Sequence, residues 1–167
     1  MILPNRVFFL LIVIGCTGLL SFGYYLEFHQ SLVPCPMCIF QRLCYIGIIV
    51  VALGAAIQGP ARVAGILYCA GIAIFAALGA VIAGRQTWLQ HLPSELIPEC
   101  GPGLEFMLEI YPLRQAIAKA LMGTGDCADV SWTFLSFSIA EWSLACFCAI
   151  IFTAFWRLRV NWGHTDS

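Results

Sequence analysis

Four long stretches of almost uninterrupted apolar residues dominate the hydrophobic pattern of the chain. Each is close to the roughly 20 residues that an α-helix needs to cross a hydrocarbon core. We predict membrane spans at about 7–26, 39–57, 63–83 and 139–156. The pattern therefore predicts an all-α membrane protein, a four-helix transmembrane bundle in which residues 1–167 form a single domain.

Local signals mark where these runs begin and end. Gln58-Gly59-Pro60 interrupts the second run, as a glycine followed by a proline is expected to do. Ser138 is followed three residues later by Glu141, the spacing of a capping box at a helix start. A cleaved signal peptide is the alternative for the first run, but Tyr24-Tyr25-Leu26-Glu27 lacks the small residues of a cleavage site. We therefore interpret the first run as a span.

The third run is rich in small residues, which allow neighbouring helices to approach closely in lipid. These residues are Gly65, Gly71, Ala73, Ala76, Ala77, Gly79 and Ala80. We therefore expect a compact bundle.

Residues 84–138 form a long segment of different composition, richer in proline, glycine and acidic side chains. We predict that it is an extramembrane loop. Within it, residues 113–122 place apolar side chains at helical spacing, with Arg114 and Lys119 among them and Gly123 at the end. The pattern predicts a short amphipathic helix, which lies either at the lipid surface or against the rest of the loop.

The overall composition agrees with a membrane location. Of the 167 residues, 61% are hydrophobic and only 10% are charged, against roughly 25% charged residues in soluble domains. The formal net charge is −1, which gives no basis for binding nucleic acid.

Basic residues divide between the two sides of the predicted bundle. One side contains Arg6, Arg62, Arg157 and Arg159, and the other contains Arg42, Arg85, Arg114 and Lys119. The first group occupies the short segments 1–6, 58–62 and 157–167, where basic residues have most influence on orientation. We therefore predict that both termini are cytoplasmic and that the loops at 27–38 and 84–138 lie on the outer side of the membrane. The protein would be a multi-pass membrane protein.

Nine cysteines fall into two groups. Five lie inside apolar runs and are interpreted as small hydrophobic residues: Cys16, Cys44, Cys69, Cys146 and Cys148. The other four lie in the predicted outer loops, where disulfides persist: Cys35, Cys38, Cys100 and Cys127.

Cys35-Pro36-Met37-Cys38 is a Cys-x-x-Cys pair directly before the second span. Such pairs commonly have one thiol of lowered pKa and take part in disulfide exchange. Two alternatives remain at this point. The four outer thiols could bind zinc, or they could form two structural disulfides, although the small ring closed by the first pair would constrain little.

Thiol oxidation needs an electron acceptor. The chain contains no dinucleotide fingerprint and no haem attachment motif, so a lipid-soluble quinone is the simplest candidate. Arg42 lies one helical turn after Cys38, where a cation would stabilise a thiolate and negative charge on a quinone oxygen. His91 and Gln86 are further candidates for quinone binding or proton transfer at the same level.

These motifs together resemble the disulfide bond formation protein B family, DsbB. The resemblance covers nearly the whole chain: Cys35-Pro36-Met37-Cys38 followed by Gln41-Arg42, Gly84-Arg85-Gln86 leading to His91, and a second loop with Cys100 and Gly125-Asp126-Cys127. Glu95 stands where some members have an uncharged polar residue, so no quinone contact is assigned there.

The resemblance implies a thiol:quinone oxidoreductase of a bacterial inner membrane that reoxidises the periplasmic dithiol oxidase DsbA. The loops at 27–38 and 84–138 would then be periplasmic. The catalytic residues would be Cys35, Cys38, Cys100 and Cys127, with Cys100 paired to Cys127. Quinone-binding residues would be Arg42, His91 and Gln86, and the acceptor would be ubiquinone or menaquinone from the membrane pool. A paralogue serving a dedicated partner, or a four-span metal-binding or assembly factor, are the alternatives.

Overall fold

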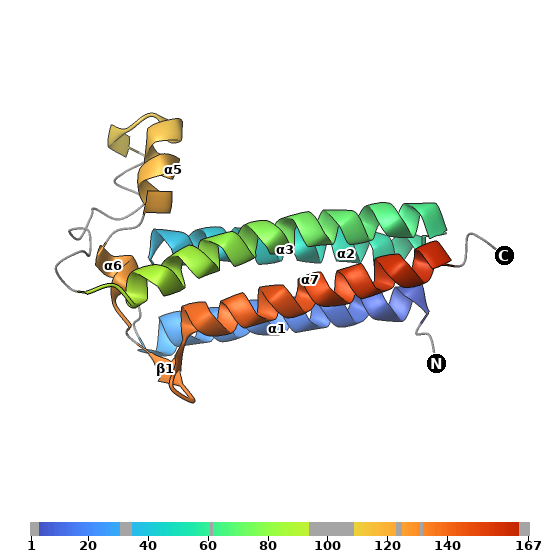
Figure 1. Ribbon diagram of the computed structural model, residues 1–167, viewed down its shortest axis with the longest axis horizontal. Helices are drawn as coiled ribbons and strands as arrows, with labels where there is room; N and C mark the ends of the chain where they lie inside the picture. Colours follow the sequence, from blue (N-terminus) through green and yellow to red (C-terminus); the bar gives the residue numbers. More distant parts are fainter. Residues whose placement is uncertain are drawn as a thin grey trace.

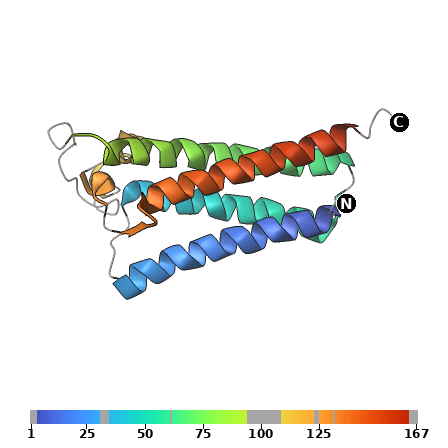
Figure 2. The ribbon, with the colours of Figure 1, turned by 60° about the horizontal axis from the view of Figure 1, so that its bottom comes forward.

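Four long helices lie side by side in a single bundle (Figures 1 and 2). The computed structural model describes residues 4–30, 35–60, 62–93, 109–122, 125–130 and 132–163. The bundle consists of α1 (Asn5–Gln30), α2 (Pro36–Gln58), α3 (Arg62–Gln90) and α7 (Ile139–Gly163). Each of these helices is long and apolar enough to cross a membrane. The predicted four-helix membrane bundle is therefore confirmed.

The remaining described elements gather at one end of this bundle, opposite the start of α1 and the end of α7 (Figure 1). They are the helices α5 (Leu113–Met122) and α6 (Gly125–Ala128) and the strands β1 (Thr133–Phe134) and β2 (Phe137–Ser138). The predicted short helix at 113–122 has the bounds of α5. Its position at the lipid surface stays a prediction.

Helix α3 is longer than the span predicted from the sequence. It continues to Gln90, so the first residues of the predicted loop 84–138 are helical. The change to polar composition after Ala83 does not break the helix, because no proline follows before His91 and the side chains of Gln86 and Leu89 are buried against the bundle. This extension gives Gln86 a fixed place on α3.

The ends of α2 are set by local chemistry. Cys35 is the N-cap residue, and its Sγ accepts a hydrogen bond from the backbone N–H of Cys38. Pro36 follows at the first helical position, where its missing N–H costs nothing. At the other end, Gly59 adopts a left-handed conformation with φ of 57° and donates its N–H to the carbonyl of Ala55. The break predicted at Gln58-Gly59-Pro60 is confirmed.

A two-stranded antiparallel hairpin leads directly into α7. Leu135 and Ser136 form its turn, and both have positive φ angles of 53° and 69°. The predicted capping box follows the hairpin: Glu141 N–H donates to Ser138 Oγ at 3.3 Å, and Ser138 N–H donates to Glu141 Oε2 at 2.6 Å. The hairpin and cap together fix where α7 begins.

Helix α3 lies at the centre of the packing. It packs against α2 and α7, while α1 packs against α2. Small residues allow these approaches, as the sequence predicts. A Cβ atom placed on Gly79 would overlap the ring of Phe147 on α7.

We expect Gly79→Ala to destabilise the bundle by about 1–3 kcal/mol, because the added methyl group forces the Phe147 ring out of its place between α3 and α7. Gly18→Ala is the matched control, since a Cβ at Gly18 meets no atom within 4 Å. Thermal unfolding in detergent micelles measures both effects. Equal stability of the two variants would show that this contact does not limit the packing.

Candidate functional site

Three of the four predicted catalytic cysteines meet where α2 begins. The Sγ atoms of Cys35 and Cys38 lie 3.0 Å apart, and the thiol of Cys127 is hydrogen-bonded to that of Cys35. Cys127 is fully buried on α6, within an apolar cluster that includes Met37 and Leu89. Cys100 lies outside the described residues. The structure therefore brings together three sulfur atoms from two segments that are far apart in the sequence.

The position of Cys35 and Cys38 at the N-terminus of α2 suits thiolate chemistry. The positive end of the helix dipole and its free N–H groups favour negative charge there. Cys127 and Cys38 donate or accept hydrogen bonds at the Cys35 sulfur, and these bonds together with burial raise the pKa of Cys35 above its ordinary value. Cys35 therefore keeps its proton in the reduced state. Negative charge on the pair is then carried by Cys38.

Gln86 contacts both of these sulfur atoms from α3. Its Nε2 group donates to Cys35 Sγ and to Cys38 Sγ, each at 3.4 Å. Its Oε1 accepts a hydrogen bond from Nε2 of Gln41, at 2.7 Å. The sequence indicates Gln86 as a candidate but not Gln41, although Gln41 lies three residues after Cys38 and so on the same face of α2.

Arg42 extends from α2 toward α1. Its guanidinium forms an ion pair with Glu27 and lies 4.5 Å from the ring centroid of Tyr24. Sequence reasoning places Glu27 in a loop and assigns it no role. In the structure α1 continues to Gln30, and this extension brings the carboxylate of Glu27 to Arg42.

A cavity of about 560 Å³ lies beside the cysteines, between α1, α2, α3 and α7. Its polar end is formed by Glu27, Cys35, Cys38, Gln41, Arg42 and Gln86. Apolar and aromatic side chains form most of the remaining wall: Leu19, Leu20, Phe22, Leu26, Tyr45, Val130, Trp132, Phe134, Ile139 and Trp142.

A second cavity of about 940 Å³ continues from the first between α1 and α7, toward the opposite end of the bundle. The two cavities share Leu19 and Cys146 in their walls. The second is lined almost entirely by apolar residues, with Arg157 at its far end. Together the cavities offer space for a molecule with a polar head and a long apolar chain.

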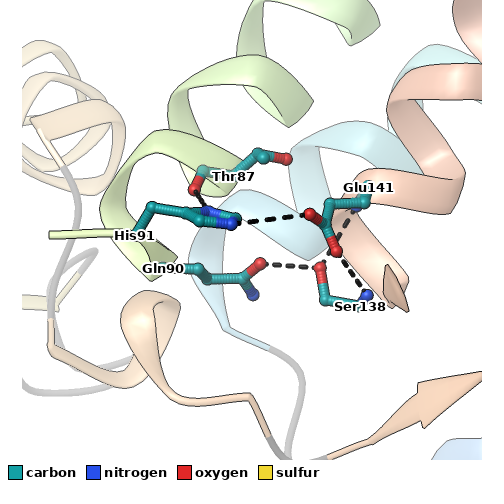
Figure 3. A network of polar contacts seen from close by, with 5 residues as sticks. All are labelled: Thr87, Gln90, His91, Ser138 and Glu141. Atoms are coloured by element: carbon teal, nitrogen blue, oxygen red, sulfur yellow. Dashed lines mark hydrogen bonds and ion pairs between the residues drawn. The ribbon is translucent and has the colours of Figure 1, made fainter. Parts of the chain in front are cut away.

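His91 lies next to this site but does not line the first cavity. Figure 3 shows its ring between Thr87 and Glu141. Nδ1 donates to the carbonyl of Thr87 at 2.9 Å, and Nε2 lies 3.7 Å from Glu141 Oε1. Glu141 also bonds Ser138, whose Oγ donates to Gln90 Oε1 at 2.7 Å. Ser138 and Gln90 do line the cavity, so the network connects His91 with its wall.

The five cysteines of the apolar runs lie on the helices of the bundle. Cys16, Cys44 and Cys69 are buried in its hydrophobic core, as expected for small apolar residues. Cys146 is half-buried in the cavity wall, and Cys148 is exposed on α7. Among the described residues, no group of three or more His, Cys, Asp or Glu side chains is arranged to hold a metal ion.

Comparison with known proteins gives a consistent result. The family model described as disulfide bond formation protein DsbB matches residues 5–157. A protein of Azoarcus sp. (strain BH72), named disulfide bond formation protein B, is 47% identical over 155 residues, which cover 92% of each chain. Proteins of the same name from Stutzerimonas stutzeri and Methylococcus capsulatus are 44% and 46% identical. These alignments cover 92% and 90% of this chain, and 94% and 92% of the relatives.

Proposed function

This chain belongs to the DsbB family of membrane disulfide bond formation proteins, and from that premise we propose that it is a thiol:quinone oxidoreductase. It reoxidises a DsbA-like periplasmic dithiol oxidase through two disulfides and passes the electrons to a membrane quinone. The observation that carries this proposal is the contact of Cys127 with Cys35, which itself lies 3.0 Å from Cys38 at the edge of the cavity.

Exchange begins at the disulfide between Cys100 and Cys127. A thiolate of the reduced partner attacks Cys100, forms a mixed disulfide and releases Cys127. Cys127 then attacks Cys35 of the Cys35-Cys38 disulfide and releases Cys38 as a thiolate. Each step needs an attacking thiolate and an accessible sulfur atom in line with it. The contact between Cys127 and Cys35 supports the second step, in which Cys127 attacks Cys35.

Two further exchanges complete the transfer. The second thiol of the partner resolves the mixed disulfide, so the partner leaves oxidised and Cys100 is reduced. Cys100 then attacks Cys127, re-forms the first disulfide and releases Cys35. The two electrons from the partner now reside on Cys35 and Cys38, with one proton on Cys35 and the other released to solvent. Their transfer to the acceptor re-forms the Cys35-Cys38 disulfide.

The cavity residues fit a quinone. A quinone supplies a two-electron, two-proton acceptor that dissolves in the bilayer, and the first cavity has a polar end for its ring and apolar walls that continue into the second cavity for its chain. Arg42 would neutralise negative charge on a ring oxygen. Gln86 would hold the Cys38 thiolate facing the cavity. His91 would act on proton transfer through Glu141, Ser138 and Gln90.

We further propose that the end of the bundle with the cysteines is periplasmic and that both termini are cytoplasmic. The start of α2 and helix α6, which carry the described cysteines, lie at the end opposite the start of α1 and the end of α7 (Figure 1), which supports this orientation. The partner would then be a periplasmic oxidase of the DsbA type, whether it oxidises many exported proteins or a dedicated client.

Purified protein in detergent is expected to oxidise reduced DsbA beyond the few equivalents that its own disulfides supply only when a quinone is added, with one quinone reduced per further disulfide formed. Parallel assays with short-chain ubiquinone and menaquinone analogues identify the preferred acceptor. Thiol titration follows the partner, and ultraviolet absorbance follows the quinone. Oxidation that proceeds equally without quinone would contradict the proposal, and stoichiometric bound metal without quinone reduction would favour the metal-binding alternative.

A further inference from the structure

Two glutamine side chains are hydrogen-bonded to each other beneath the reactive cysteines. Gln41 on α2 and Gln86 on α3 are both about 95% buried. The bond runs from Nε2 of Gln41 to Oε1 of Gln86, at 2.7 Å. Buried amides need such partners because no water replaces them. The pair therefore forms a fixed polar contact between two helices at the base of the site.

This contact determines which end of the Gln86 amide faces the sulfur atoms. An amide has one oxygen that accepts and one nitrogen with two hydrogens that donate. Because Gln41 donates to the oxygen of Gln86, the nitrogen of Gln86 points to Cys35 and Cys38, 3.4 Å from each Sγ. A rotation of the amide by half a turn would put the oxygen against the sulfurs, where it would repel a thiolate.

The same contact favours the charged form of the thiol over the neutral form. A neutral Cys38 thiol can donate to the sulfur of Cys35, at 3.0 Å, or to the oxygen of Gln86, at 3.7 Å. Gln41 already occupies this oxygen at the shorter distance. A thiolate at Cys38 instead accepts the N–H of Gln86, and hydrogen bonds to charged groups are stronger than those between neutral groups.

We propose that Gln41 is a positioning residue for the redox cysteines: it holds the Gln86 amide in the rotation that donates to the Cys38 thiolate. The inference rests on the proposed function only in taking Cys38 as the sulfur that faces the acceptor. Within the described residues, Gln41 makes no hydrogen bond to a sulfur atom and acts through Gln86. The raised pKa of Cys35 agrees with this arrangement, since it leaves the charge to Cys38.

The test measures the rate of iodoacetamide alkylation of Cys38 as a function of pH, in reduced protein without quinone or partner. Mass spectrometry of the modified peptide separates Cys38 from the other cysteines. In Gln41→Met, we expect the midpoint of the pH profile to move to higher pH and the rate at neutral pH to fall about fivefold to tenfold. The plateau at high pH should stay the same, because it reports access rather than charge.

Companion variants separate positioning from a general effect on packing. Gln86→Met should slow the reaction at least as much, and Gln41→Met combined with Gln86→Met should slow it no further than Gln86→Met. Gln41→Asn, which keeps an amide but is too short to reach Gln86, should match Gln41→Met and serves if methionine impairs folding. Gln58→Met is the matched control, because Gln58 is also on α2 but lies at its other end, where it accepts a hydrogen bond from Tyr68.

An unchanged midpoint in Gln41→Met and Gln41→Asn would overturn the inference, as would a change in the plateau alone. Additive effects of the Gln41 and Gln86 substitutions would also overturn it, since the two residues would then act separately. None of these outcomes depends on quinone reduction or on partner oxidation. Failure of the proposed function, with Cys38 alkylation still dependent on Gln41, would therefore be recognised as a different result.

Discussion

Replacing Cys127 with serine is expected to lower quinone-dependent oxidation of DsbA by about three orders of magnitude or more, the scale on which loss of a nucleophile acts. Serine fits the buried site of Cys127 but cannot form a disulfide with Cys35. Electrons that enter the second loop would then have no covalent route to the Cys35-Cys38 pair. The expected result is a mixed disulfide that forms but does not proceed to turnover.

Two measurements locate the defect. Dithiothreitol, a small dithiol, should still reduce the Cys35-Cys38 disulfide directly in Cys127→Ser, and its quinone-dependent oxidation should persist. Cys148→Ser is the matched control, because Cys148 is exposed on α7 and lies away from the three sulfur atoms. It should retain full activity with DsbA. Normal turnover in Cys127→Ser would exclude electron transfer through this residue.

Much of the fold is predictable because membrane spans are governed by length and apolar content alone. The four runs give the four helices, and Gly59 and the capping box at Ser138 set two of their ends. The closeness of Cys35, Cys38 and Arg42 also follows from the sequence, since residues three or four apart share a helix face. These features depend on residues that are close together in the sequence, and a sequence pattern can therefore predict them.

The rest of the site depends on packing between distant segments. No periodicity indicates that Cys127 reaches Cys35 or that the amide of Gln86 faces the sulfurs, because α6 and α3 are placed by tertiary contacts. The composition also predicts too early an end for α3. The polar composition after Ala83 is typical of a loop, whereas the helix continues to Gln90.

The hairpin before α7 escapes prediction for a different reason. Its turn at Leu135 and Ser136 has positive φ at both positions, a conformation usually signalled by glycine or asparagine. Neither residue type is present there. Surrounding contacts hold this turn instead, among them the hydrogen bond from Trp142 Nε1 to the carbonyl of Phe134 at 3.0 Å. Such context cannot be read from the turn residues themselves.

Arg42→Leu is expected to lower quinone-dependent turnover by about a hundredfold and to raise the apparent KM for quinone, while DsbA capture stays intact. Removal of one group that stabilises developing negative charge typically has an effect of this size. The structure adds a second cause. Loss of Arg42 leaves the carboxylate of Glu27 without its ion-pair partner beside the cavity, where it would repel negative charge on a quinone oxygen.

The ion pair provides the experiment that separates these causes from a role in anchoring the helix. Arg42→Leu combined with Glu27→Gln removes the unpaired carboxylate, so it should recover part of the turnover that Arg42→Leu loses. Arg42→Lys retains the charge but not the planar guanidinium over Tyr24, and it should be intermediate. Initial rates at varied quinone concentration, with saturating DsbA, measure KM and kcat for each variant. Unchanged values in Arg42→Leu would show that Arg42 serves the packing of α1 on α2 and not the acceptor.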